Sequence, residues 1–228
     1  MKRMKKLKRR PEPELMDSEA QTLAYAEADF DEANSLFTKS FTDFFTGLPA
    51  TGRMADLGCG PGDIAIRMAR AFPGWSVTGL DAGENMLKRA GERLDGQDLQ
   101  SRVSFRLSYL PDETLEKNAW NAVISNSLLH HLPAPQVLWK SITELGAPGA
   151  AVQVMDLMRP ESQEDAQKLV DLYAADAPDI LREDFYNSLL AAYTPVEISD
   201  QLVSAGLDRL KIIIPSDRHW IVCGTLGS

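Results

Sequence analysis

Hydrophobic and polar residues follow two different periods along the chain. Between residues 17 and 45, apolar side chains recur three, four or seven positions apart with acidic residues between them, which predicts helices. From residue 53 onward, short apolar runs alternate with stretches of helical period. The apolar runs predict strands at 53–58, 75–81, 102–108, 121–126 and 149–157, and the intervening stretches predict helices at 62–72, 83–94 and 134–145.

Strands that alternate with helices in this way imply right-handed crossovers and therefore a parallel sheet. After Pro160 the alternation gives way to a mostly helical stretch that ends at Tyr193. A further helix at 194–206 leads into two closing strands at 209–215 and 219–226, whose short link suits an antiparallel pair. The pattern predicts an α/β fold that is interrupted by helices after its fifth strand.

Basic residues are concentrated at the start of the sequence. Seven of the 24 Lys and Arg residues stand in the first ten positions, whereas all 33 Asp and Glu residues follow them. We expect residues 1–16 to form a disordered, solvated tail, because prolines follow the basic run. Residues 17–228 would form a single domain, with cap helices at 17–47 and a helical cap insertion at 160–195.

The composition argues against several classes of protein. The hydrophobic fraction of 44% and the charged fraction of 25% are ordinary for a soluble globular protein, and no apolar stretch approaches the roughly 20 residues of a membrane span. No apolar export segment follows the basic start, so we expect a cytoplasmic location. Cys59 and Cys223 are too few for a disulfide framework or a closed zinc site, and no metal is expected.

The segment "DLGCGPGD" (residues 56–63) places three glycines directly after the first predicted strand. Ligands of doubly wound sheets bind at the carboxyl ends of the strands, and residues without a Cβ let a ligand approach the backbone closely. Asp81 ends the second predicted strand, where a carboxylate can accept hydrogen bonds from ribose hydroxyls. These features indicate an adenosine-bearing ligand.

The spacing of the glycines discriminates among such ligands. A dinucleotide fingerprint reads G-x-G-x-x-G and receives a pyrophosphate, whereas this chain has G-x-G-x-G, with Pro61 removing one backbone donor. Asp56 stands two residues before the first glycine, and a carboxylate repels a pyrophosphate but attracts an ammonium group. The pattern favours a ligand with a ribose and a cationic amino-acid end.

Four segments, in order, resemble the class I S-adenosylmethionine-dependent methyltransferases over about residues 53–159. They are "MADLGCGPGDIAI", "VTGLDAGENMLKRA", "NAVISNSLLHHL" and "GAPGAAVQVMDLMRP". The resemblance implies a Rossmann-like, mainly parallel sheet of seven strands with an antiparallel last strand, helices on both faces and a helical cap. It also implies S-adenosylmethionine as the cofactor and methyl transfer as the activity.

The same resemblance implies ten cofactor-binding residues at the ends of the first four strands: Asp56, Gly58, Gly60, Asp81, Ala82, Met86, Tyr109, Leu110, Asn126 and Ser127. The first three would line the methionine part of the cofactor, and Asp81 would hold the ribose hydroxyls. Ala82 and Met86 would lie near the adenine, and Asn126 and Ser127 would approach the sulfonium. Tyr109 stands where the family often has an Asp that reads the adenine amino group, so Leu110 would supply a backbone donor there.

Methyl transfer from a sulfonium is an in-line displacement with a neutral leaving group, so the protein mainly aligns and desolvates the reactants. A base is needed only where the acceptor must lose a proton. His130 and His131 follow the fourth strand and Asp156 ends the fifth, and these three are the candidate catalytic residues. The structural alternative is that they pack against the pocket or cap turns.

The helical additions before the first strand and after the fifth would cover the strand ends and shape an acceptor pocket. The candidate substrate residues in these additions are Tyr25, Tyr186, Asn187 and Tyr193. The alternative is that they hold the cap to the sheet.

We expect a small-molecule acceptor, because the body of the chain is acidic and carries no appended RNA-binding module. An RNA or protein methyltransferase that docks through the basic tail is the first alternative. The others are a catalytically silent cofactor-binding protein, a relative that uses a carboxyl-modified cofactor for tRNA chemistry, and a nicotinamide oxidoreductase. The acceptor atom and the oligomeric state do not follow from the sequence.

Overall fold

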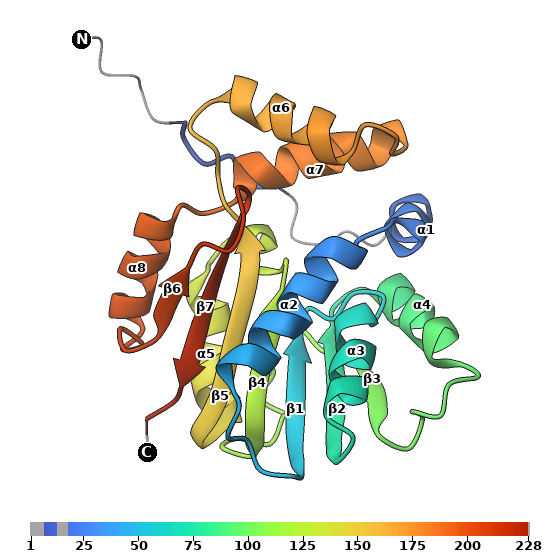
Figure 1. Cartoon of the computed structure of the whole chain (residues 1–228), viewed down its shortest axis with the longest axis vertical. Coiled ribbons are helices and arrows are strands. Elements are labelled where there is room, and N and C mark those ends of the chain that lie inside the picture. The colour runs from blue at the N-terminus through green and yellow to red at the C-terminus, as the bar shows by residue number, and fades with distance from the viewer. Residues whose placement is uncertain (1–6, 13–17, 228) are drawn as a thin grey trace.

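The computed structural model describes residues 7–12 and 18–227, and its strands form one sheet in the order β3-β2-β1-β4-β5-β7-β6 (Figure 1). The strands are β1 (Gly52–Leu57), β2 (Trp75–Asp81), β3 (Val103–Leu107), β4 (Trp120–Asn126), β5 (Gly146–Leu157), β6 (Lys211–Ile213) and β7 (His219–Thr225). The helices are α1 (Glu19–Glu27), α2 (Asp31–Phe44), α3 (Asp63–Ala71), α4 (Glu84–Leu94), the short η1 (Leu129–His131), α5 (Gln136–Leu145), α6 (Gln163–Tyr173), α7 (Asp179–Ala191) and α8 (Pro195–Ser204). Within these described ranges no helix is both long and apolar enough to cross a membrane.

Strands β1 to β5 pair in parallel, whereas β7 runs antiparallel to both β5 and β6. This arrangement confirms the predicted Rossmann-like α/β sheet with an antiparallel last strand. The edge strand β6 is shorter than its predicted range of 209–215. The Leu210 amide bonds to the Leu207 carbonyl in a turn, and Pro215 has no amide hydrogen to donate.

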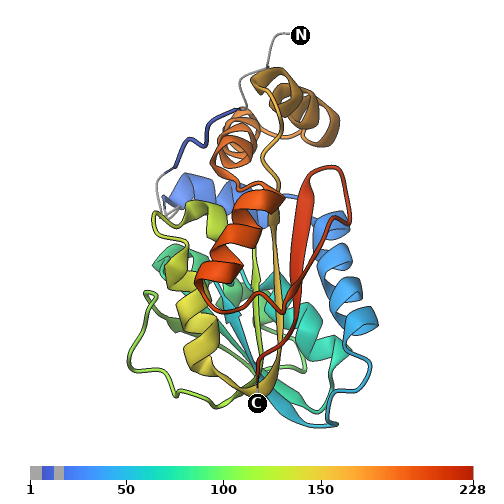
Figure 2. The same cartoon turned by 90° about the vertical axis from the view of Figure 1, so that its left-hand side faces the viewer.

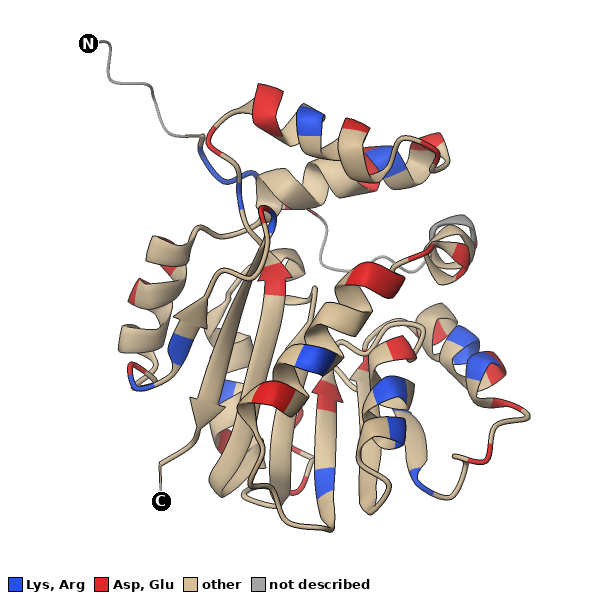
Figure 3. Ribbon diagram, viewed as in Figure 1, with Lys and Arg blue, Asp and Glu red and all other residues tan. Residues whose placement is uncertain are grey.

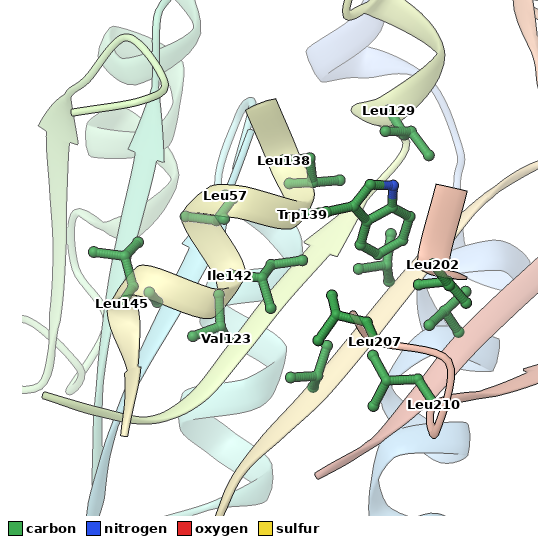
Figure 4. Close-up of a cluster of buried hydrophobic side chains, with 14 of the residues drawn as sticks. Leu57, Val123, Leu129, Leu138, Trp139, Ile142, Leu145, Leu202, Leu207 and Leu210 are labelled. Carbon is green, nitrogen blue, oxygen red and sulfur yellow. The ribbon is translucent and has the colours of Figure 1, made fainter. Parts of the chain in front are cut away.

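Helices cover both faces of the sheet (Figure 2). One face packs against α5 and α8, with Trp139 and Trp220 among the fully buried side chains. Trp139 lies between the two helices and the strands (Figure 4), and its indole nitrogen donates a 2.9 Å hydrogen bond to the Gln201 side chain. The other face packs against α2 and α3. Each large apolar side chain buried here contributes about 1.5–3 kcal/mol.

Helix α2 belongs to the core, although residues 17–47 were expected to form a cap. Phe37 and Phe41 are fully buried on the sheet face that α3 also covers. The Gln153 side-chain amide of β5 donates to the Phe37 carbonyl at 2.9 Å, which ties α2 to the middle of the sheet. Among the described residues of this segment, those that reach the ligand side of the fold belong to α1, the α1–α2 turn and the first turn of α2.

The helices of the predicted insertion at 160–195 form a small layer of their own beyond the carboxyl end of β5 (Figure 1). The apolar faces of α6 and α7 meet in a separate cluster built around Leu157, Val170 and Leu189. Helix α7 also contacts α1 and η1. The insertion therefore borders the strand ends that carry the predicted ligand residues.

Residues 7–12 lie along α7, so the expectation of a disordered tail is wrong for this segment. The Arg10 amide donates to the Leu190 carbonyl at 2.9 Å. The Arg9 guanidinium donates to the carbonyls of Ala191 (2.6 Å) and His130 (2.8 Å), and it stacks 4.2 Å from the ring centroid of Tyr193. Arginine fits this position because its planar group satisfies several carbonyls and an aromatic face together. Residues 1–6 and 13–16 of the predicted tail lie outside the described residues.

The outer helices carry both signs of charge. Basic and acidic residues both stand on α4 and α6 (Figure 3). Ion pairs at helical spacing join Arg89 to Glu92 and Lys168 to Asp165. Such mixed faces lack the single-sign stripe that tracks a phosphate backbone.

Candidate active site

A cavity of about 400 Å³ opens at the carboxyl ends of β1, β2 and β4. All ten residues predicted to bind a cofactor line it: Asp56, Gly58, Gly60, Asp81, Ala82, Met86, Tyr109, Leu110, Asn126 and Ser127. They come together because β2, β1 and β4 are neighbours in the sheet, so their ends meet at one edge.

The loop between β1 and α3 is shaped by glycines with positive φ. Gly58 has a φ of 70°, and a Cβ at this position would meet the Leu128 side chain at 2.7 Å. Gly62 has a φ of 80° at the N-cap of α3, and a Cβ there would meet the Phe105 ring at 2.5 Å. Larger residues would therefore strain the backbone and clash. The loop keeps its backbone exposed to the cavity.

Asp81 is held in place by two backbone amides. Its Oδ2 accepts from the Gly60 amide at 2.7 Å, and its Oδ1 accepts from the Gly83 amide at 2.8 Å. Charge-assisted bonds of this kind fix the orientation of a carboxylate. A carboxylate oxygen can accept two hydrogen bonds, so bonds to these amides are compatible with bonds from a ligand diol.

Asp56 is the most unusual charged residue of the site. It is 1% exposed, and neither carboxylate oxygen accepts a hydrogen bond of normal geometry from the described residues. Burial and the nearby charge of Asp81 raise the pKa of Asp56 to about 8, against the smaller opposing effect of the Ala65 backbone amide. A buried carboxylate without a partner is costly. This site therefore fits a ligand that brings a cationic group.

The free energy of unfolding of the ligand-free protein should fall as the pH rises from about 5 to about 8. The Asp56 carboxyl has a pKa of about 8 when folded, against an ordinary value of 3.8. The stability it contributes is complete below the ordinary pKa and is lost as the pH rises through the folded pKa, by about 1 kcal/mol per pH unit. Urea unfolding of the wild type and of Asp56→Asn at several pH values measures the slope. Equal slopes in the two proteins would contradict the assignment.

The end of β4 supplies a strained backbone and an uncompensated polar atom. Ser127 is not glycine but has a φ of 55°, a conformation that is enriched at functional sites. The buried Asn126 Oδ1 has no hydrogen-bond partner among the described residues. Across the cavity Tyr109 is 62% exposed, so its ring lies at the rim. The cavity is thus polar at β4 and open at the loop after β3.

Sequence reasoning missed the ion network that closes one side of the cavity. Asp63 at the start of α3 pairs with Arg67 and with Arg93 of α4, and Arg67 also pairs with Asp31 of α2. Arg93 donates in addition to the Ala26 carbonyl of α1 at 2.8 Å, so this network anchors the α1–α2 turn over the cavity. Apart from the Asp63–Arg67 spacing on α3, the partners are far apart in the sequence, so no local pattern signals them.

The three candidate catalytic residues occupy two layers. His131 lines the cavity, whereas His130 and Asp156 are buried behind it. His130 Nδ1 lies 2.5 Å from Asp156 Oδ1, and the His130 amide donates to Asp156 Oδ2 at 3.0 Å. Burial lowers the pKa of His130, but the Asp156 carboxylate more than offsets this and leaves that pKa above its ordinary value.

The four candidate substrate residues are not brought together. Tyr25 lines the cavity, and burial raises its pKa to about 12, so its phenol stays protonated. Tyr186 packs on the small cluster between α6 and α7, and Asn187 is exposed. Tyr193 is buried beneath Arg9. Of these residues only Tyr25 borders the cavity.

The fold is a Rossmann-like domain, and the lining of its cavity is chemically suited to a ligand with a ribose and a cationic end. Comparison with known proteins agrees: a family profile described as "Methyltransferase domain" matches residues 55–152. Trans-aconitate 2-methyltransferase of Variovorax paradoxus (strain S110) is 33% identical over 132 residues, which cover 58% of this chain and 48% of that protein. The chain thus spans about half the length of this curated relative.

Solved structures share the fold. A SAM-dependent methyltransferase from Aquifex aeolicus superposes with a TM-score of 0.67 at 15% identity, over 92% of this chain and 98% of that one. Human N-acetylserotonin methyltransferase in complex with SAM gives a TM-score of 0.65 at 20% identity, over 92% and 57% of the two chains. The chain thus contains a segment, residues 55–152, that matches a methyltransferase-domain profile, and it shares its fold with these solved methyltransferases.

Proposed function

We propose that this protein transfers a methyl group from S-adenosylmethionine to a small-molecule acceptor. One observation carries the proposal. Two carboxylates face one cavity at the strand ends: Asp81, which backbone amides orient, and Asp56, which is buried and has no hydrogen-bond partner in the part of the chain that the structure describes. A ribose diol suits the first and an ammonium group suits the second. S-adenosylmethionine carries both groups on one molecule.

The lining residues have distinct proposed roles. Asp81 binds the ribose hydroxyls, and Asp56 with the Gly58–Gly60 loop receives the amino-acid end. Met86 and Leu110 lie on the adenine side, where Tyr109 replaces the acid that related sequences often have. Asn126 and Ser127 border the sulfonium. Each of these positions lines the cavity, which supports the assignment.

The bound cofactor supplies a methyl group already activated on a sulfonium, so the protein's task is to align the acceptor and exclude water. His131 is the candidate catalytic residue that borders the cavity, and we assign it contact with the acceptor. His130 and Asp156 lie behind it and hold the loop after β4 in position. Tyr25 covers the same region from α1 as a hydrogen-bond donor.

Several observations support a small acceptor. The cavity of about 400 Å³ lies at the lower end of the range for small-molecule sites, and the cofactor shares it. The similar proteins described above are named for trans-aconitate and N-acetylserotonin, both small molecules. Arg9, from the basic run that a nucleic-acid partner would need, is engaged inside the protein. The unpaired, buried Cys59 and Cys223 agree with a cytoplasmic location.

Calorimetric titration with S-adenosylmethionine, S-adenosylhomocysteine and NADH tests the cofactor. We expect the first two to bind in the micromolar range with 1:1 stoichiometry and NADH not to bind. Methyl transfer from labelled cofactor is then measured against a panel of small carboxylic acids, phenols and amines. Binding without transfer to any acceptor would favour a silent cofactor-binding protein, and binding of NADH alone would refute the proposal.

A further inference from the structure

Three potential metal ligands converge behind the cavity, from parts of the chain that are far apart in the sequence. Glu12 comes from the N-terminal segment, and His130 and His131 come from η1. The side chains of Glu12, His130 and His131 are 11%, 3% and 14% exposed. One donor atom from each lies within 4.8 Å of the others. The three side chains thus form a compact, nearly buried cluster.

The two distances from Glu12 to the histidines fit metal coordination better than hydrogen bonding. Glu12 Oε1 lies 3.4 Å from His130 Nε2 and 3.3 Å from His131 Nδ1. Both values exceed the roughly 2.7–3.2 Å of an N–H···O hydrogen bond. Ligands about 2.0–2.1 Å from a tetrahedral zinc ion stand about 3.3–3.4 Å apart, which is the edge of that tetrahedron.

The surroundings hold two of these ligands in orientations that suit a metal. In the neutral tautomer that can bind a metal, the His130 Nδ1–H donates to Asp156 Oδ1, and the lone pair is then on Nε2, which lies 3.4 Å from Glu12 Oε1. A carboxylate behind a ligating histidine is the usual outer partner of such sites. The Ser188 hydroxyl donates to Glu12 Oε1 at 3.1 Å and fixes that carboxylate.

The charges around the cluster also favour a cation. Asp156 is hydrogen-bonded to His130, and the charges of Asp156 and Asp184 act on Glu12. Arg9 supplies one positive charge through its contact with the His130 carbonyl. The Asp156 carboxylate next to His130 would attract a divalent ion held by the cluster.

We propose that Glu12 Oε1, His130 Nε2 and His131 Nδ1 bind a divalent transition-metal ion, with zinc the best match to the geometry. Three protein ligands leave the fourth position of a tetrahedral ion for water or another ligand, as in catalytic rather than structural zinc sites. His131 also lines the cavity, so the ion lies beside the acceptor region; that consequence rests on the proposed function, whereas metal binding does not. No local sequence pattern signals this site, because Glu12 lies in the predicted tail.

Metal binding is tested on the untagged, full-length protein without cofactor. Equilibrium dialysis against Zn²⁺ should give one tightly bound ion per chain, and Co²⁺ should give the intense visible absorption of four-coordinate cobalt. Glu12→Gln and His131→Gln should each weaken Zn²⁺ binding by at least about the 10- to 100-fold that loss of an outer partner causes. Glu19→Gln, an exposed acid on α1, and His219→Gln, the third histidine of the chain, are the matched controls and should bind as the wild type does.

Circular dichroism and thermal melting establish that each variant is folded. If His131→Gln does not fold, Zn²⁺ binding by Glu12→Gln alone tests the proposal. Zn²⁺ should also raise the melting temperature of the wild type but not of Glu12→Gln, because the ion ties the N-terminal segment to η1. The proposal is overturned if the folded wild type binds no stoichiometric ion, or if Glu12→Gln binds Zn²⁺ as tightly as Glu19→Gln does. Neither result depends on methyl transfer, so failure of this site and failure of the proposed activity are separable.

Discussion

Replacing Asp81 by alanine is expected to weaken the binding of S-adenosylmethionine and S-adenosylhomocysteine by at least about 100-fold. The carboxylate is fixed by the amides of Gly60 and Gly83 and points into the cavity. Two hydrogen bonds from a ribose diol to a charged group are worth about 1.5–3 kcal/mol each, and the variant loses both. Calorimetric titration of the wild type and the variant measures the change directly.

Two further variants make the result specific. Asp81→Asn keeps one acceptor oxygen, so its cofactor affinity should be about tenfold weaker than that of the wild type. This loss is smaller than the one expected for Asp81→Ala. Asp98→Ala removes an exposed acid before β3, away from the cavity, and should bind as the wild type does. Cofactor affinity that is unchanged in a folded Asp81→Ala protein would contradict the ribose assignment and with it the placement of the cofactor.

Replacing Asp156 by alanine is expected to destabilise the protein by about 3–5 kcal/mol. The carboxylate is 1% exposed and accepts three hydrogen bonds, from the His130 ring, the His130 amide and the Leu157 amide at 2.6 Å. Removing one partner of a buried charged pair leaves the other partner buried without compensation. Urea unfolding followed by circular dichroism measures the loss.

The control for this experiment is Asp208→Ala, which removes an exposed acid after α8 and should change the free energy of unfolding by less than about 0.5 kcal/mol. Asp156→Asn retains an acceptor of the same shape and should fall between the two. Asp156 does not line the cavity, so Asp156→Asn, where folded, should bind S-adenosylmethionine with nearly wild-type affinity. A loss of stability no larger than that of Asp208→Ala would show that the buried network is not a structural element.

The ligand side of the fold could be predicted because it is built from local signals at strand ends. The segment at residues 56–63 needs positive φ at Gly58 and Gly62, and only glycine takes that conformation without strain. Asp81 is the last residue of a strand adjacent to β1, and parallel neighbours bring their carboxyl ends to one edge. Each signal lies within a few residues, so the sequence displays it directly.

The acceptor side could not be predicted, because its contacts join distant segments. Helix α2 has the same amphipathic pattern whether it caps the cavity or covers the sheet, and its burial against β5 decided the matter. Tyr186 and Asn187 stand on a helix of the cap, but the packing of α7 on α6 turns them away from the cavity. A helical period fixes which residues share a face but not which neighbour that face meets.

The sequence by itself therefore determined the order of strands and helices along the chain, the glycine loop, and the two acids at the carboxyl ends of β1 and β2, Asp56 and Asp81. Backbone conformation and hydrophobic period are local properties, and they are written in consecutive residues. Only the tertiary structure decided that Arg9 and Glu12 return to the loop after β4 and that His131 faces the cavity while His130 lies behind it. Those outcomes depend on which buried polar groups become hydrogen-bond partners when the chain folds. Such partners are far apart in the sequence, so no local sequence pattern indicates them.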